Sequence, residues 1–188
     1  MGKLIYNITT TLDGYVADSN SNFDWAEPSE EVLTFVNKVL GNVGIFLFGR
    51  SLYETMAVWD TWPTDEPSEA INNFVKIWQR AEKIVYSTTL SEVPTKNTKL
   101  EHTFDPHAIR QLKEQSVMDL AIGGPHLAAA AMKANLIDEY HQTIVPIVIG
   151  EGNSWLPPSL SLKMQLVNVQ RFENGSVHLH YKPTESRG

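Results

Sequence analysis

Short apolar runs of strand length alternate with amphipathic segments of helix length over the first two thirds of this chain. Each expected helix has a polar cap or a glycine at its boundary, as at Ser29 and Gly41 or at Ser68. We expect strands at residues 4–10, 43–48, 83–87, 100–104 and 118–122, and helices at 29–41, 51–56, 68–78, 105–115 and 127–135. This alternation predicts an α/β fold with a largely parallel sheet and helices on both faces.

The last third of the chain has a different pattern. Residues 139–149, 164–172 and 177–182 are expected to be strands, and Asn174-Gly175 is a strong signal for a hairpin. These strands are expected to be antiparallel, which makes the whole sheet mixed. We find no repeat and no convincing linker, so residues 1–188 are expected to form a single domain.

Composition and charge exclude several classes of protein. Apolar residues make up 42% of the 188 residues, and the net charge is −7. An acidic chain has no excess of cations to neutralise phosphates, so we expect neither nucleic acid nor an anionic membrane as a partner. The absence of cysteine excludes disulfides and thiolate metal sites, and cytoplasm is the expected location. The beginning of the chain alternates like a strand, without the apolar core of a signal peptide.

Two segments combine a buried strand, a glycine at its end and the start of a helix. They are Gly49-Arg50-Ser51 and Gly123-Gly124-Pro125-His126. In an open α/β sheet this arrangement points backbone N–H groups at the ligand crevice, where a phosphate is favoured. Arg50 adds a permanent positive charge, and Ser87-Thr88 adds hydroxyls at the end of a third strand. Each glycine alone could be ordinary turn geometry, but together these residues predict a dinucleotide site; the P-loop and Rossmann motifs are absent.

Three further residues are candidates for the substrate side. Asp13, in the turn after the first strand, could hold or protonate a substrate, or could serve only as the turn-forming aspartate before Gly14. Trp25 could stack on a planar ring or cover the core, and Glu151 could face a substrate or solvent.

The histidines show no spacing that predicts a metal site. His102, His107, His141, His178 and His180 form no grouping with carboxylates in the sequence. His178 and His180 share one face of a strand, where such pairs are usually exposed. We therefore expect no metal.

Six ordered segments of the chain resemble the reductase domain of bacterial riboflavin-biosynthesis deaminase-reductases and their stand-alone relatives, within the dihydrofolate-reductase-like superfamily. The segments are residues 11–17, 49–56, 83–90, 123–124, 136–139 and 146–152. The resemblance implies a dihydrofolate-reductase-like fold and NADPH as hydride donor. It implies that the adenosine phosphate and pyrophosphate lie near Arg50, Ser51, Leu52, Ser87 and Thr88, and that the pyrophosphate is closed in by Gly123, Gly124, His126 and Leu127.

The resemblance also implies an activity, hydride transfer to a small polar heterocycle or a ribosylamino-pyrimidine. Two alternatives stay open: reduction of dihydrofolate or another pteridine, and a nucleotide-binding module without turnover. The carboxylate that dihydrofolate reductases place on the helix after the first strand has no secure counterpart, since no motif aligns Glu30 or Glu31 with it. A homodimer is expected from the resemblance and from the apolar residues Ile144, Val145, Ile147 and Val148.

Overall fold

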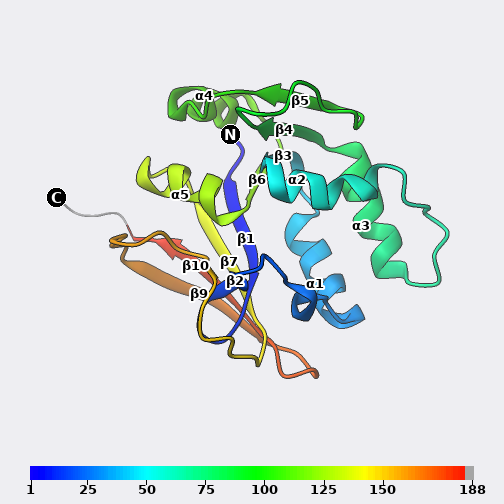
Figure 1. Ribbon diagram of the computed structural model, residues 1–188, viewed down its shortest axis with the longest axis vertical. Helices are drawn as coiled ribbons and strands as arrows, with labels where there is room; N and C mark the ends of the chain where they lie inside the picture. The colour runs from blue at the N-terminus through cyan, green and yellow to red at the C-terminus, as the bar shows by residue number, and fades with distance from the viewer. Residues whose placement is uncertain (185–188) are drawn as a thin grey trace.

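Eight strands form one mixed sheet in the computed structural model, which describes residues 1–184 (Figure 1). Their order across the sheet is β5-β4-β3-β6-β1-β7-β10-β9. The strands of this sheet are β1 (Leu4–Thr10), β3 (Val43–Gly49), β4 (Glu82–Tyr86), β5 (Thr98–Glu101), β6 (Asp119–Gly123), β7 (Glu139–Ile144), β9 (Met164–Arg171) and β10 (Val177–Pro183). A separate two-stranded sheet pairs β2 (Tyr15–Ala17) with β8 (Asn153–Ser154).

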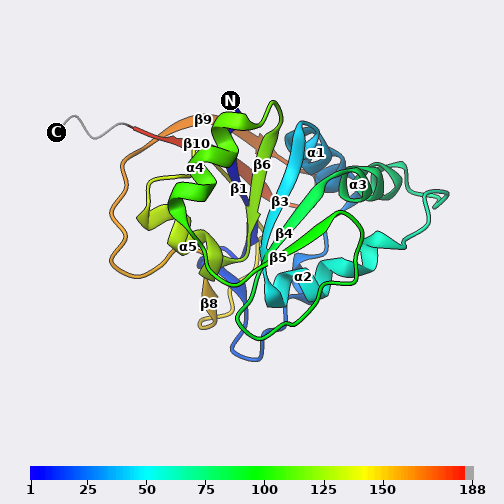
Figure 2. The same ribbon diagram turned by 90° about the horizontal axis from the view of Figure 1, so that it is seen from above.

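Helices cover both faces of the large sheet, as the alternation predicts. They are α1 (Glu30–Leu40), α2 (Arg50–Met56), α3 (Glu69–Arg80), α4 (Pro106–Gln115) and α5 (Pro125–Lys133), with short 3-10 helices η1 (Asp24–Ala26) and η2 (Ala57–Asp60). Figure 2 shows α1 and α3 on one side of the sheet and α4 and α5 on the other. Side-chain caps begin three of these helices: Ser29 caps α1, Ser68 caps α3 and Asp105 caps α4.

Two apolar clusters form the core, one on each face of the sheet. On the side of α1 and α3, Phe46 and Phe48 stack against Trp78, with ring centroids 5.9 and 5.5 Å away. On the side of α4 and α5, Leu120 and Met132 are fully buried. Both clusters pack the helices against the sheet. This close packing keeps the ends of the strands in fixed positions.

The parallel and antiparallel parts of the sheet meet at β7. All pairings among β5, β4, β3, β6, β1 and β7 are parallel, and β10 is antiparallel to both β7 and β9. The expectation that the last third is antiparallel is confirmed for β9 and β10 and only in part for β7, which is antiparallel to β10 but parallel to β1. This strand follows α5, and a helical crossover returns the chain in the parallel direction.

Strand 139–149 was expected to be longer than the strand that forms. β7 ends at Ile144, because β1 ends at Thr10 and Pro146 has no N–H to continue a ladder. The chain then turns, and the N–H of Leu12 donates to the carbonyl oxygen of Ile147 at 2.8 Å. The strand expected at 100–104 lies at 98–101 instead.

The described residues contain no helix long and apolar enough to span a membrane.

Candidate active site

The two strand-to-glycine-to-helix junctions lie side by side at one edge of the sheet. β3 and β6 are neighbours, and Phe48 is the register partner of Gly123. α2 begins directly after Gly49, and α5 begins directly after Gly124. Gly124 has a φ of +86°, in the left-handed region that only glycine adopts without strain. The sequence patterns therefore converge on one place, where the carboxyl ends of parallel strands open a crevice.

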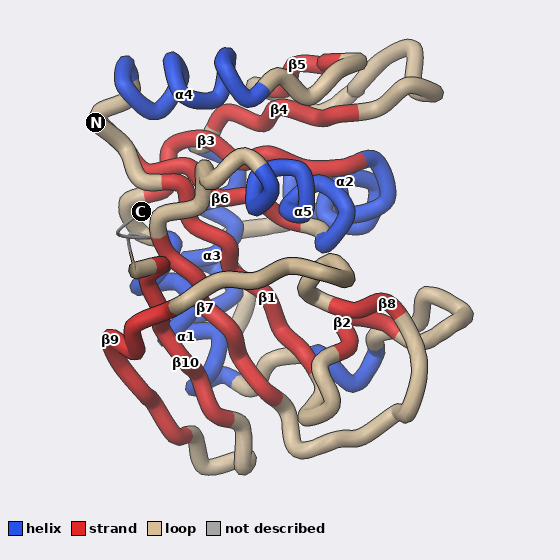
Figure 3. The backbone as a smooth tube through the Cα atoms, turned by 90° about the vertical axis from the view of Figure 1, so that its left-hand side faces the viewer, coloured by secondary structure: helices blue, strands red, loops and turns tan. Residues whose placement is uncertain are grey.

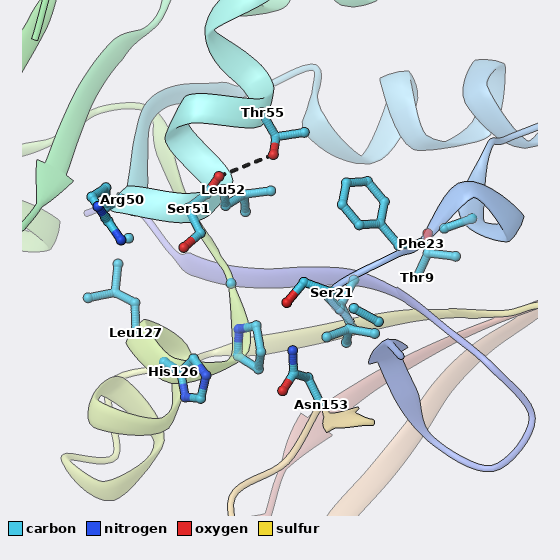
Figure 4. Close-up of a pocket in the computed structure, with 17 residues that line it drawn as sticks. Thr9, Ser21, Phe23, Arg50, Ser51, Leu52, Thr55, His126, Leu127 and Asn153 are labelled. Atoms are coloured by element: carbon cyan, nitrogen blue, oxygen red, sulfur yellow. Dashed lines mark hydrogen bonds between the residues drawn. The ribbon is translucent and has the colours of Figure 1, made fainter. Parts of the chain in front are cut away.

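A cavity of about 520 Å³ occupies this crevice. Most of the predicted cofactor residues line it: Gly49, Arg50, Ser51, Leu52, Gly124, His126 and Leu127. Figure 4 shows Arg50 and Ser51, from α2, facing His126 and Leu127, from α5, across the cavity. A volume of this size is in the range of small-molecule and cofactor sites.

The other wall of this cavity was not predicted. Thr9, Ser21, Phe23 and Asn153 line it, at the end of β1 and around the small β2–β8 sheet (Figure 4). A Cβ atom on Gly152 would lie 2.1 Å from the carbonyl oxygen of Ala17. Only glycine at position 152 therefore lets the two strands of this small sheet approach each other. β2 and β8 have three and two residues, too few to show the alternation of apolar and polar residues that marks a strand. They are more than 130 residues apart in the sequence, so their pairing could not be predicted from it.

The cavity wall is open at Gly49 and carries a positive charge at Arg50. A Cβ atom added at Gly49 would meet no heavy atom of residues 1–184 within 4 Å. Within residues 1–184, the Arg50 guanidinium makes no hydrogen bond or ion pair with another side chain, and it is exposed. A permanent cation beside exposed backbone is an arrangement that suits a phosphate group.

A second cavity of about 410 Å³ adjoins the first and lies against α1. The two cavities share the lining residues Ile8, Thr9, Ala26 and Leu52, so they are neighbours in the crevice. Apolar side chains dominate the second cavity, Glu27 is the charged residue in its lining, and no Lys, Arg or His of residues 1–184 lines it. The side-chain oxygen of Asn7 is buried there without a hydrogen-bond partner among the described residues. A buried unpaired acceptor is unfavourable, and a ligand that donates a hydrogen bond would relieve it.

Two of the predicted cofactor residues, Ser87 and Thr88, line neither cavity. Gly123 lines the second cavity and not the first. Ser87 is buried, and its hydroxyl accepts hydrogen bonds from the N–H groups of Thr89 and Leu90 at 3.2 and 3.0 Å. It therefore forms the turn after β4, next to the junction that carries Arg50.

The three candidates for the substrate side also lie outside the cavities. Trp25 and Glu151 line neither cavity, although Ala26, next to Trp25, lines both. The Asp13 carboxylate accepts hydrogen bonds from the backbone N–H groups of Ile149 and Gly150, at 3.2 and 2.8 Å. The nearby Thr11 hydroxyl, together with these N–H groups, lowers the pKa of Asp13. The geometry favours the turn-forming interpretation of Asp13, because the side chain closes a loop and does not face a cavity.

The carboxylates at the start of α1 are used in packing. Glu30 accepts hydrogen bonds from the Ser68 hydroxyl at 2.5 Å and from the N–H of Ala70 at 3.2 Å. Glu31 accepts a hydrogen bond from the N–H of Glu173 at 3.0 Å. Neither residue lines the second cavity, so α1 presents apolar side chains there.

Two expectations for the histidines near the end of the chain are wrong, namely that they form no grouping with carboxylates and that His178 and His180 are exposed. His178 is fully buried and His141 is 7% exposed, and His141 and His180 lie beside the carboxylate of Glu139. The sequence spacing could not show this grouping, because it depends on the register between β7 and β10.

Comparison with solved structures places this fold in the dihydrofolate-reductase-like class. A putative riboflavin biosynthesis protein from Shewanella sp. PV-4 has a TM-score of 0.76 and 23% identity, over 98% of this chain and 100% of its own. The deaminase/5-amino-6-(5-phosphoribosylamino)uracil reductase of Thermotoga maritima has a TM-score of 0.68 and 16% identity, over 97% of this chain and 57% of its own. Dihydrofolate reductase from Enterococcus faecalis, complexed with NADP(H), has a TM-score of 0.66 and 13% identity, over 98% of both chains.

The family model of the RibD C-terminal domain matches residues 2–178. The chain belongs to this family, and so to a family of riboflavin-pathway reductase domains.

Proposed function

We propose that this protein is an NADPH-dependent reductase that binds the cofactor in the first cavity and the hydride acceptor in the second. The observation that carries the proposal is the unpaired Arg50 beside the open backbone at Gly49, on the wall opposite His126 and Leu127. The Enterococcus faecalis dihydrofolate reductase with the same fold was solved with NADP(H), which supports a nicotinamide cofactor here.

The residues of the first cavity fit a phosphorylated dinucleotide. Arg50 would hold a phosphate, and backbone N–H groups at the start of α5, which has no side-chain cap at Gly124, would face another. When bound, the cofactor supplies a hydride; the reaction consumes NADPH, one proton and the acceptor, and yields NADP⁺ and the reduced acceptor. The chain contributes binding, orientation of the two partners and exclusion of water by the apolar walls.

The second cavity favours a small, planar heterocycle as the acceptor. An N–H group on the ring would donate to the buried oxygen of Asn7, and the apolar walls would pack against its faces. Within the described part of the chain, the second cavity offers no cation to pair with a phosphate. A phosphorylated ribosylamino-pyrimidine therefore fits only if its ring enters this cavity and its phosphate stays outside. Glu27, between η1 and α1, is a carboxylate that lines the second cavity, so a pteridine stays an alternative acceptor and belongs in the test panel.

Cofactor titration followed by turnover tests this function. We expect NADPH to quench the tryptophan fluorescence with saturation, because Trp59 lines the adjoining cavity. NADPH oxidation should then follow with at least one member of a panel of pteridines, ribosylamino-pyrimidines and quinones. Binding without oxidation across the panel would favour a nucleotide-binding module, and the absence of binding would contradict a reductase function.

A further inference from the structure

Strand geometry brings three potential metal ligands together on one face of the sheet, away from both cavities. Glu139 and His141 are two residues apart on β7, so their side chains share a face. His180, on the antiparallel neighbour β10, is the register partner of His141. None of the three lines either cavity, so the proposed reductase site makes no use of them.

Each imidazole nitrogen lies at a suitable distance from the carboxylate oxygen for both to bind one ion. The Nε2 atoms of His141 and His180 each lie 3.5 Å from Oε2 of Glu139, and the ligand atoms of the three residues lie within 4.8 Å of one another. Ligands about 2.0–2.2 Å from a tetrahedral zinc ion lie roughly 3.3–3.6 Å apart. Both Nε2 atoms are buried and have no hydrogen-bond partner among the described residues. Two unpaired nitrogens aimed at one carboxylate oxygen are the second, independent sign of a ligand.

A further histidine orients His141 in the way that outer residues orient metal ligands. Nδ1 of His141 lies 3.0 Å from Nε2 of His178, and Nδ1 of His178 lies 3.0 Å from the hydroxyl oxygen of Thr143. If His141 donates to His178 and His178 donates to Thr143, the lone pair of His141 Nε2 is left facing Glu139. With this direction of hydrogen bonds, His141 has the tautomer that binds a cation, and His178 and Thr143 hold its ring in place.

Two lysines hold the other oxygen of the same carboxylate. Lys3 and Lys182 contact Oε1 of Glu139 at 3.0 and 3.2 Å, which leaves Oε2 to the two imidazoles. Their side chains are 53% and 47% exposed, so both can turn toward solvent. Their positive charges oppose a cation at Oε2 and set a limit on its affinity.

We propose that Glu139, His141 and His180 bind one divalent transition-metal ion, such as Zn²⁺ or Co²⁺, with water as the fourth ligand. Imidazole nitrogen and carboxylate oxygen are ligands that suit these ions. The rings of His141 and His180 are stacked at 18°, with centroids 4.0 Å apart, and must tilt for their lone pairs to converge on the ion. The ion ties β7 to β10, so its effect is on the stability of this part of the sheet.

The test uses full-length, untagged protein, stripped with a chelator and then dialysed against Zn²⁺ or Co²⁺. We expect one ion per chain, a melting temperature that rises with ion concentration, and the visible absorption of tetrahedral Co²⁺. His180→Gln should weaken binding on the order of tenfold to a hundredfold or abolish it. The matched control is His107→Gln, an exposed histidine on α4, which should bind the ion like the parent.

A lysine variant gives a second test, in which ion affinity should rise and no proposed ligand is removed. Lys182→Gln should tighten ion binding, because it removes one positive charge next to Glu139. The proposal is overturned if the stripped parent binds no ion, if His180→Gln binds it as tightly as the parent, or if His107→Gln loses it.

Discussion

A phosphate site needs accessible backbone and a positive charge. Gly49 provides the first and Arg50, the next residue, provides the second. The backbone of Gly49 has φ −76° and ψ 162°, which alanine also adopts, and a methyl group there would touch no atom in the part of the chain that the structure describes. Gly49→Ala is therefore a substitution that the fold tolerates, while its methyl group would enter the space of the cofactor.

We predict that Gly49→Ala leaves the melting temperature equal to or slightly above that of the parent and weakens NADPH binding by roughly tenfold or more. Thermal unfolding and fluorescence titration measure the two quantities. Gly41→Ala, at the end of α1 and outside both cavities, is the control and should bind NADPH normally. Equal affinities for the parent and Gly49→Ala would show that no group of the cofactor approaches this residue.

The sequence predicts individual residues of the site where local geometry decides their position. Arg50 and His126 could be placed at the crevice because each follows a glycine at the end of a buried strand. Asn153 and Phe23 could not, because the pairing of β2 with β8 depends on the packing of distant segments. The surroundings of Asp13 show the same limit, since its hydrogen-bond partners lie more than 130 residues away.

At the scale of elements, a buried lysine links β4 to α3 and η2. The side chain of Lys83 is fully buried; its Nζ donates to the carbonyl oxygen of Trp78 at 3.3 Å and lies 3.9 Å from Oδ1 of Asp60. Burial lowers the pKa of Lys83, and Asp60 offsets part of this effect. The unfolded chain therefore binds more protons than the native state between the lowered pKa and 10.5, so this residue makes stability rise with pH in that range.

We predict opposite results for removing one member of this pair and for removing both. Asp60→Asn should destabilise the protein by about 2–3 kcal/mol, because it leaves the buried Lys83 charge without its partner. The double variant Lys83→Met with Asp60→Asn, which removes both charges and keeps the volume, should be neutral or stabilising relative to the parent. Urea unfolding measures both variants, and a strong loss of stability in the double variant would contradict this account.

Elements with their own start and stop signals could be predicted, and those without them could not. α1, α3 and α4 begin at the expected caps, Ser29, Ser68 and Asp105, since a cap acts within one turn of its helix. The end of β7 was missed, because it depends on where its neighbour β1 stops.

At the scale of the whole molecule, one edge strand of the sheet carries a group of exposed apolar side chains. β9 is an edge strand, and Leu166, Val167 and Val169 on it are each about half exposed. Of the residues expected to form an apolar surface, Val145 is buried and Val148 is exposed. Figure 3 shows β9 and β10 at one end of the molecule, with α2 and α5 toward the other.

We predict a homodimer that covers the β9 edge, since a long apolar edge strand is a ready site of association. Sedimentation at micromolar concentration should give a dimer for the parent and a monomer for the double variant Val167→Lys and Val169→Lys. NADPH binding should persist in that variant, because β9 lines neither cavity. A monomeric parent would contradict the prediction.

The central claim is that Arg50 binds a phosphate of NADPH, and two titrations of Arg50→Ala test it most directly. Fluorescence titration with NADPH should show a loss of about 1.5–3 kcal/mol relative to the parent, on the order of tenfold to a hundredfold in affinity. The loss for NADH should be smaller if the contact is to the 2′-phosphate, and equal if it is to the pyrophosphate. Arg110→Ala, on α4 and outside both cavities, should bind both cofactors like the parent. Unchanged affinity of Arg50→Ala for both cofactors would contradict the proposed site.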